Sequence, residues 1–172
     1  MKLYRARVPS IATAVIDTLA NDGDIEVEAT QRAEAVADLV AIMENYLQRD
    51  HALSDAVRAK MDAENLPWDA RSKARQDVAT EWNHPTGREV EFFLSNQFVE
   101  NFMISRFVEE VFTDDRTLKA KVRTIVKGFD VDESALRAEA EERIKNINKG
   151  SVEYQDALSR ALKEVKKRHG LV

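Results

Sequence analysis

The 172-residue chain contains no cysteine, and this absence excludes several kinds of site. Disulfides, thiol nucleophiles and cysteine-ligated metals cannot form. Five glycines and three prolines are too few for a glycine-rich loop that cradles phosphate. No apolar run reaches the roughly 18 to 20 residues of a membrane span, and the basic N-terminus lacks the apolar segment of an export signal. We therefore expect a protein of the cytoplasm, a reducing compartment.

What the chain does contain favours helices and a single domain. Hydrophobic residues make up 44% and charged residues 33%, with abundant Ala, Glu, Lys and Arg. A chain of this length buries enough surface to fold without a metal or crosslink, so we expect one helical domain over residues 1–172. The net charge of −5 arises wholly in residues 1–86, where 15 acidic residues face 10 basic ones. That balance does not favour a general nucleic-acid binder.

One stretch, Glu89 to Phe112, is far more aromatic than the rest of the chain. It holds six of the seven phenylalanines, and its apolar residues spread around the whole helical wheel. This pattern predicts a single helix that is buried on most sides. Thr86 and Glu89 have the spacing of a capping box at its start. The predicted fold is therefore an all-α multi-helix bundle around this central apolar helix.

Helical spacing and turn residues predict the other elements. The stretch Asp24 to Glu28 alternates briefly like a strand, but no matching strand is evident, so we expect an isolated extended connector. A bend or break is expected near Asp50 and His51. The predicted helices cover residues 9–20, 29–48, 52–64, 69–82, 116–127, 133–148 and 152–168.

Two similarly built halves, residues 1–86 and 87–172, are a further possibility. At an offset of 105, residues 52–66 match residues 157–171 at five of fifteen positions. Each half also has a short apolar helix, an Asp-rich turn, a long helix, a break and a shorter helix. Pseudo-repeated halves explain this order, and so does convergent helical patterning.

Two segments carry a resemblance to a known family. The opening MKLYRARVPSIATAVIDTLANDGDIEVE and the later SRFVEEVFTDDRTLKAKV resemble an uncharacterised bacterial family, catalogued as domain of unknown function five-hundred-seven. The resemblance extends over essentially the whole chain. It implies an intracellular bacterial helical protein, and it brings no activity, cofactor or catalytic residue with it.

No residue pattern predicts catalysis, cofactor binding or a metal site. The histidines His51, His84 and His169 are interpreted as surface or capping residues, since none lies in a motif such as H-E-x-x-H. Acidic clusters lie at predicted helix ends and connectors, where they are expected to cap helices. These clusters are residues 22–28, 109–115 and 130–133.

A basic helix, residues 116–127, is the sharpest chemical feature. Five positive side chains and no acidic one lie between Arg116 and Phe129. Together with the basic C-terminal tail it could bind phosphates or an anionic surface. Pairing with the acidic first half of the chain is the alternative, and no aromatic residue is evident beside these cations for base stacking. The candidate anion-binding residues are Arg116, Lys119, Arg123, Lys127, Lys166, Lys167 and Arg168.

The expected function is a non-enzymatic protein–protein interaction or scaffold role. The central stretch is richer in aromatics than the Ala, Val and Leu expected to cover it, so a protein partner or a second copy in a homodimer would complete its burial. Nucleic-acid or anionic-surface binding through residues 116–127 and the tail is the alternative.

Overall fold

The computed structural model describes residues 1–149 and 151–172, and it confirms the all-α fold class. Short 3₁₀ helices at Arg5–Arg7 and Trp68–Ala70 and a two-stranded sheet accompany the α-helices. The α-helices of the described residues are α1 (Val8–Asn21), α2 (Arg32–Ala63), α3 (Arg71–Glu81), α4 (Glu89–Ile104), α5 (Asp115–Lys127), α6 (Glu133–Arg143) and α7 (Val152–Arg168).

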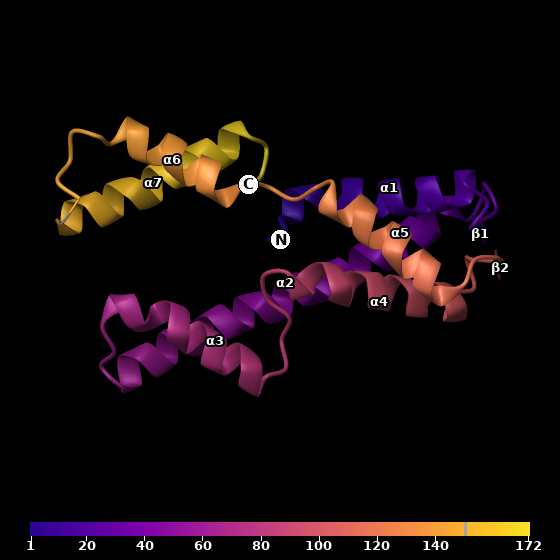
Figure 1. The fold of residues 1–172 in the computed structure, drawn as a ribbon, viewed down its shortest axis with the longest axis horizontal. Helices are drawn as coiled ribbons and strands as arrows, with labels where there is room; N and C mark the ends of the chain where they lie inside the picture. The colour runs from indigo at the N-terminus through magenta and orange to yellow at the C-terminus, as the bar shows by residue number, and fades with distance from the viewer. Residues whose placement is uncertain (150) are drawn as a thin grey trace.

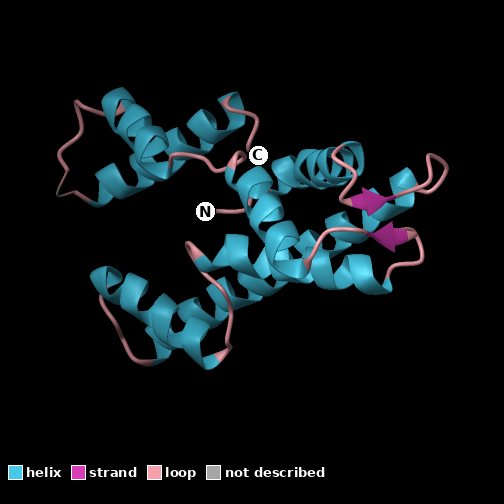
Figure 2. Cartoon of the chain, turned by 45° about the vertical axis from the view of Figure 1, so that its right-hand side comes forward, coloured by secondary structure: helices cyan, strands magenta, loops and turns pink. Residues whose placement is uncertain are grey.

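Three hydrophobic clusters divide the helices. The main core joins α1, α4, α5 and the first half of α2. The second half of α2 packs with α3 in a separate cluster, which we call the α2–α3 arm. Helices α6 and α7 pack with Tyr4 in a third cluster, the α6–α7 arm. Both arms extend from one side of the main core, and the N-terminus lies between them (Figures 1 and 2).

Helix α2 runs for 32 residues without interruption, so the predicted break near Asp50 and His51 is wrong. Neither residue breaks a helix when its side chain has a partner away from the local backbone. Asp50 reaches Arg75 of α3, and His51 pairs with Asp55 one turn later at 3.3 Å. The continuous helix carries apolar residues of the main core in its first half and of the α2–α3 arm in its second.

Helix α4 is shorter and less buried than the sequence predicted. It ends at Ile104, where Ser105 adopts an extended conformation, rather than at Phe112. One face packs into the main core and includes Phe98, which is fully buried. Its other face leaves Phe92 and Met103 half exposed, so the expectation of a helix buried on most sides is wrong.

The connector after α1 has a strand partner, contrary to expectation. Strand β1 (Ile25–Glu26) pairs antiparallel with β2 (Glu110–Val111), and Ile25 lies opposite Val111. The sequence prediction missed this pairing because residues 110–111 were assigned to the central helix. The sheet places Asp24 beside the start of α5, where it accepts hydrogen bonds from Thr113 and Lys121, both at 2.6 Å.

Acidic residues cap helices as predicted. The Asp114 carboxylate accepts from the backbone N–H of Thr117 at the start of α5, and Asp132 caps α6 in the same way. Half of the predicted capping box forms, since the Thr86 N–H donates to Glu89 at 3.2 Å. Helix α6 ends at Arg143 rather than at residue 148. Ile144 and Ile147 then pack on the α6–α7 arm from outside the helix.

The two faces of α4 predict a contrast between two phenylalanines. Phe98→Ala should lower the free energy of unfolding by about 3 to 5 kcal/mol, because it empties a fully buried site. Phe92→Ala on the same helix should cost less than about 1 kcal/mol, because half of that side chain already contacts water. Urea denaturation measures both. Equal losses would mean that the outer face of α4 is also packed.

Candidate functional site

The basic face of α5 is partly paired within the chain. Lys121 bonds to Asp24 at 2.6 Å and lies 3.4 Å from Asp22, so one cation does pair with the acidic first half. Burial alone would raise the pKa of Asp24, but the hydrogen bonds from Lys121 and Thr113 outweigh it and lower that pKa. Within the described residues, no ion pair or hydrogen bond holds the side chains of Arg116, Lys119 or Lys127.

The basic tail lies in a different packing unit and is largely neutralised there. Lys166 pairs with Glu133 at 3.4 Å, and Arg168 pairs with Glu139 of the neighbouring helix α6. Lys167 is exposed. The tail belongs to the α6–α7 arm, whereas α5 belongs to the main core. The structure therefore does not gather the seven predicted anion-binding residues into one cluster.

Exposed apolar side chains accompany the basic face of α5. The Arg123 guanidinium lies 4.9 Å from the ring centre of Phe92, so the basic face of α5 borders the outer face of α4. Phe92 and Met103 are three helical turns apart on that outer face. The two helices run antiparallel (Figure 1). We define the α4–α5 surface as Phe92, Met103, Ile104, Phe112, Arg116, Lys119, Arg123 and Lys127.

This surface supplies the aromatic group that sequence reasoning did not find beside the basic helix. Phe92 lies 31 positions before Arg123, and only the pairing of α4 with α5 brings the two together. Ile104 is 84% exposed and Phe112 is 59% exposed, which is unusual for side chains of this size. The arrangement combines apolar contact area with unpaired positive charge.

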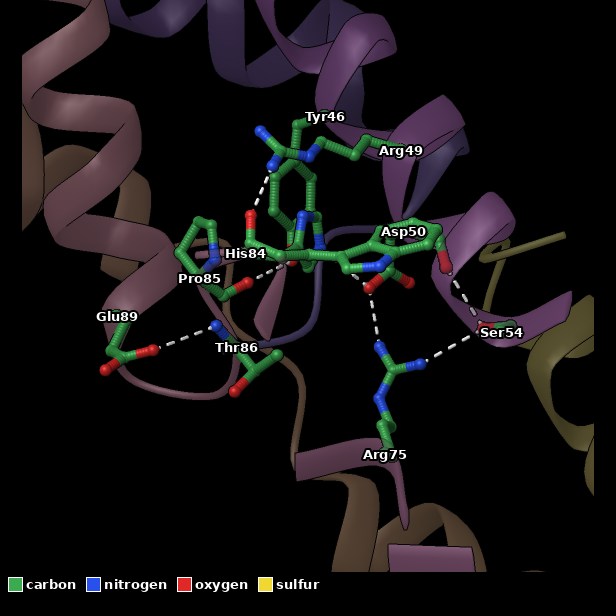
Figure 3. Close-up of polar contacts among 10 residues, drawn as sticks. Tyr46, Arg49, Asp50, Ser54, Arg75, His84, Pro85, Thr86 and Glu89 are labelled. Atoms are coloured by element: carbon green, nitrogen blue, oxygen red, sulfur yellow. Dashed lines mark hydrogen bonds and ion pairs between the residues drawn. The ribbon is translucent and has the colours of Figure 1, made fainter. Parts of the chain in front are cut away.

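A second polar cluster lies where α2, α3 and the segment before α4 meet (Figure 3). His84 Nε2 lies 3.1 Å from a carboxylate oxygen of Asp50, and Arg75 bonds to the same oxygen at 2.5 Å. Arg75 also donates to the Ser54 hydroxyl at 3.1 Å. Tyr46 stacks on the His84 ring with centroids 4.9 Å apart and donates its hydroxyl to the Pro85 carbonyl. We call this set the Asp50 junction.

His84 is buried, so its interpretation as a surface residue is wrong, but its backbone N–H does cap the end of α3 by donating to the Ala79 carbonyl at 2.8 Å. A carboxylate only accepts hydrogen bonds, so Nε2 carries the proton that faces Asp50. Nδ1 is then an acceptor, and it is buried without a hydrogen-bond partner. Desolvation by burial lowers the pKa of His84 and outweighs the opposing effect of Asp50. The ring stacks on Tyr46 and contacts Asp50, and these contacts connect α2 to the segment before α4.

The position of Asp50 in the sequence of α2 indicates the Asp50 junction. Buried residues of α2 recur at alternating spacings of four and three, at Leu39, Met43, Tyr46, Leu53 and Val57. Asp50 occupies the position between Tyr46 and Leu53 where this spacing requires an apolar residue. A charged residue in that register indicates a buried polar contact.

No metal site or membrane-spanning segment is found in the described part of the chain. Across residues 1–149 and 151–172, no three His, Asp or Glu side chains are placed to hold a metal ion. In the same residues, every helix falls short of the apolar length needed to cross a bilayer, and this includes the 32-residue α2.

Comparison with known proteins identifies a family but no activity. The model of a family described as "Protein of unknown function (DUF507)" matches residues 1–171. A search of curated proteins returned no match. The family match agrees with the resemblance in the two segments quoted above.

Burial of His84 predicts a dependence of stability on pH. Its folded-state pKa lies below the ordinary value of 6.5, so the unfolded chain takes up a proton first as the pH falls. The free energy of unfolding should therefore fall as the pH drops below about 6.5. His84→Gln should remove this part of the slope. Urea denaturation at several pH values measures it.

Replacement of the exposed His51 by Gln provides the matched control, because it removes an imidazole from the surface of α2 instead of from the interior. An NMR titration of the intact protein gives an independent check through the imidazole signals of His84. A midpoint at or above 6.5 would contradict the assignment of His84 as a buried neutral group.

Proposed function

The chain belongs to the DUF507 family of proteins of unknown function, so we propose its role from its exposed surface. We propose a non-enzymatic protein–protein interaction module. Its α4–α5 surface binds an acidic, partly apolar surface of another protein. The observation that carries this proposal is the exposure of Phe92, Met103, Ile104 and Phe112, together with the contact of Phe92 with Arg123 on the basic face of α5. The bacterial cytoplasm is the proposed location, since a chain without cysteine is suited to a reducing compartment.

Exposed aromatic side chains and arginines are the groups that most often dominate the energy of protein interfaces. Phe92 and Arg123 already contact each other, so both are partly ordered before a partner arrives. Ordering in advance reduces the entropy that binding must overcome. These features support an interface centred on α4 with the cations of α5 at its edge.

Charge favours a different protein over a second copy of this chain as the partner. In a two-fold dimer whose axis passes close to α5, the basic face of α5 would lie near the same face of the other copy. Between Arg116 and Phe129 no acidic residue offsets the positive charges, so the copies would repel each other there. An acidic partner removes that repulsion, and self-association becomes an outcome to be tested.

The test is crosslinked affinity capture from the native host with three variants. Phe92→Asp and Ile104→Asp should each weaken binding of the captured partner by about 30-fold or more, the effect of losing an interface hot spot. Trp68→Asp is the matched control, because Trp68 is 68% exposed but lies beside α3. Thermal melts followed by circular dichroism establish that each variant is folded.

A partner retained equally by all three variants would overturn the proposed surface. Binding of the captured partner should also weaken as salt rises, because the cations of α5 are exposed and therefore screened. Light scattering across a dilution series tests the homodimer. A dimer that Ile104→Asp dissociates would replace the acidic partner with a second copy.

Nucleic-acid or anionic-surface binding is the second candidate, and the contact between Phe92 and Arg123 is the observation that favours it. An exposed ring beside a guanidinium provides a stacking surface for a base. In a mobility-shift assay at low salt, Arg123→Glu combined with Lys127→Glu should abolish retention of DNA or RNA. Absence of retention by the unaltered protein at low salt would eliminate this candidate.

A further inference from the structure

A cavity of about 430 Å³ lies between the N-terminal residues, α2 and the start of α3. It is separate from the α4–α5 surface and adjoins the Asp50 junction. A second hollow along α2 shares Lys2, Leu3, Asp50 and Ser54 with it. The combined space suits a small organic molecule. The cavity is lined by Met1, Lys2, Leu3, Tyr46, Asp50, Ser54, Arg71, Arg75, Thr86 and Gly87.

Positive side chains outnumber negative ones in the lining of this cavity. Three of them, Lys2, Arg71 and Arg75, are cationic, and Asp50 is the one carboxylate among the lining residues. Asp50 is already bonded to Arg75 and His84, so it offers little compensation to the other two cations. The side chains that line the cavity therefore carry an excess of two positive charges.

Both uncompensated cations have donor groups available. Arg71 stacks on Trp68, with its guanidinium 5.0 Å from the ring centre, and stacking leaves the N–H edge of the group open. No hydrogen bond or ion pair holds it within the described residues. The Lys2 ammonium lies 5.4 Å from the centre of the Tyr4 ring. Both groups can therefore donate to an incoming anion.

Lys2 also lies near Lys166, a cation that is not among the lining residues of the cavity. Desolvation of its ammonium group and then repulsion from Lys166 lower the pKa of Lys2, and the attraction of Glu133 and Asp50 does not offset them. The Lys166 ammonium also lies 5.4 Å from the centre of the Tyr4 ring, so both ammonium groups lie close to the same ring. A bound anion would relieve this repulsion.

We propose that this cavity binds a small phosphorylated molecule, with its phosphate held by Lys2 and Arg71. A phosphate monoester carries a charge of about −1.5 to −2 near neutral pH, which matches the excess of the cavity. Arginine forms paired hydrogen bonds to phosphate oxygens, and lysine adds a point charge. Arg75 keeps its hydrogen bonds to Asp50 and Ser54 and forms part of the cavity lining that the phosphate contacts. The organic part of the molecule extends along α2 into the adjoining hollow.

Isothermal titration of the full chain with phenyl phosphate and with inorganic phosphate, at low and constant ionic strength, tests the proposal. Lys2→Gln and Arg71→Gln should each weaken phenyl phosphate binding by about tenfold or more, because each removes a charge-assisted hydrogen bond. Lys73→Gln changes the net charge by the same amount on an exposed position of α3 outside the cavity. It should change the affinity less than about twofold.

Amide NMR spectra recorded during the titration locate the bound probe. Shifts concentrated at Ser54, Arg71 and Gly87 would support the cavity as the site. Absence of binding by both phosphates would overturn the proposal. So would equal weakening by Lys73→Gln and Arg71→Gln, which would indicate a diffuse response to charge, or shifts confined to α5.

Discussion

Helix α2 is shared by two hydrophobic cores, and the relative placement of those cores depends on its remaining unbroken through Asp50. The carboxylate lies between the apolar residues of the main core and those of the α2–α3 arm. A partly buried carboxylate is costly unless hydrogen bonds compensate it, and Arg75 and His84 both do so from outside α2. These bonds attach α3 and the segment before α4 to the middle of α2. The same contact therefore fixes the position of the arm and the entry to α4.

The sequence predicted the fold where local chemistry decides it. Asp114 and Asp132 cap helices as their positions indicate, and the turn at residues 83–87 separates α3 from α4. The sequence-based prediction was wrong where a residue far away in the chain determines the local structure. The strand at Glu110–Val111 exists because Ile25 pairs with it from 86 positions away, and helical spacing in that stretch concealed it. The Asp50 junction was not predicted, because the partners of Asp50 lie in α3 and in the segment before α4. The division into halves at residues 86 and 87 stays a prediction, although the main core draws on both sides of that boundary.

The candidate anion-binding residues show how folding redistributes charge. The sequence groups the cations of α5 with those of the tail, but the structure pairs Lys166 and Arg168 of the tail with carboxylates of α6. Among residues 1–149 and 151–172, Arg116, Lys119 and Lys127 have no such partner. A second local excess lies around Lys2 and Arg71, which are 69 positions apart and have no shared sequence motif. Spacing along a helix identifies a basic face, but only packing determines which of its charges stay uncompensated.

Tyr4 packs in the core of the α6–α7 arm, and its hydroxyl donates to Glu133, 129 positions later in the chain. During synthesis, the main core can assemble once α5 has left the ribosome, whereas Tyr4 must wait for α6 and α7. Contacts of such long sequence separation form late, because a large loop must close before they contribute. The segment around Tyr4 is thus made before α6 and α7 but reaches its native neighbours only after them. In the interval, the segment that lines the cavity at Lys2 lacks its support from the α6–α7 arm.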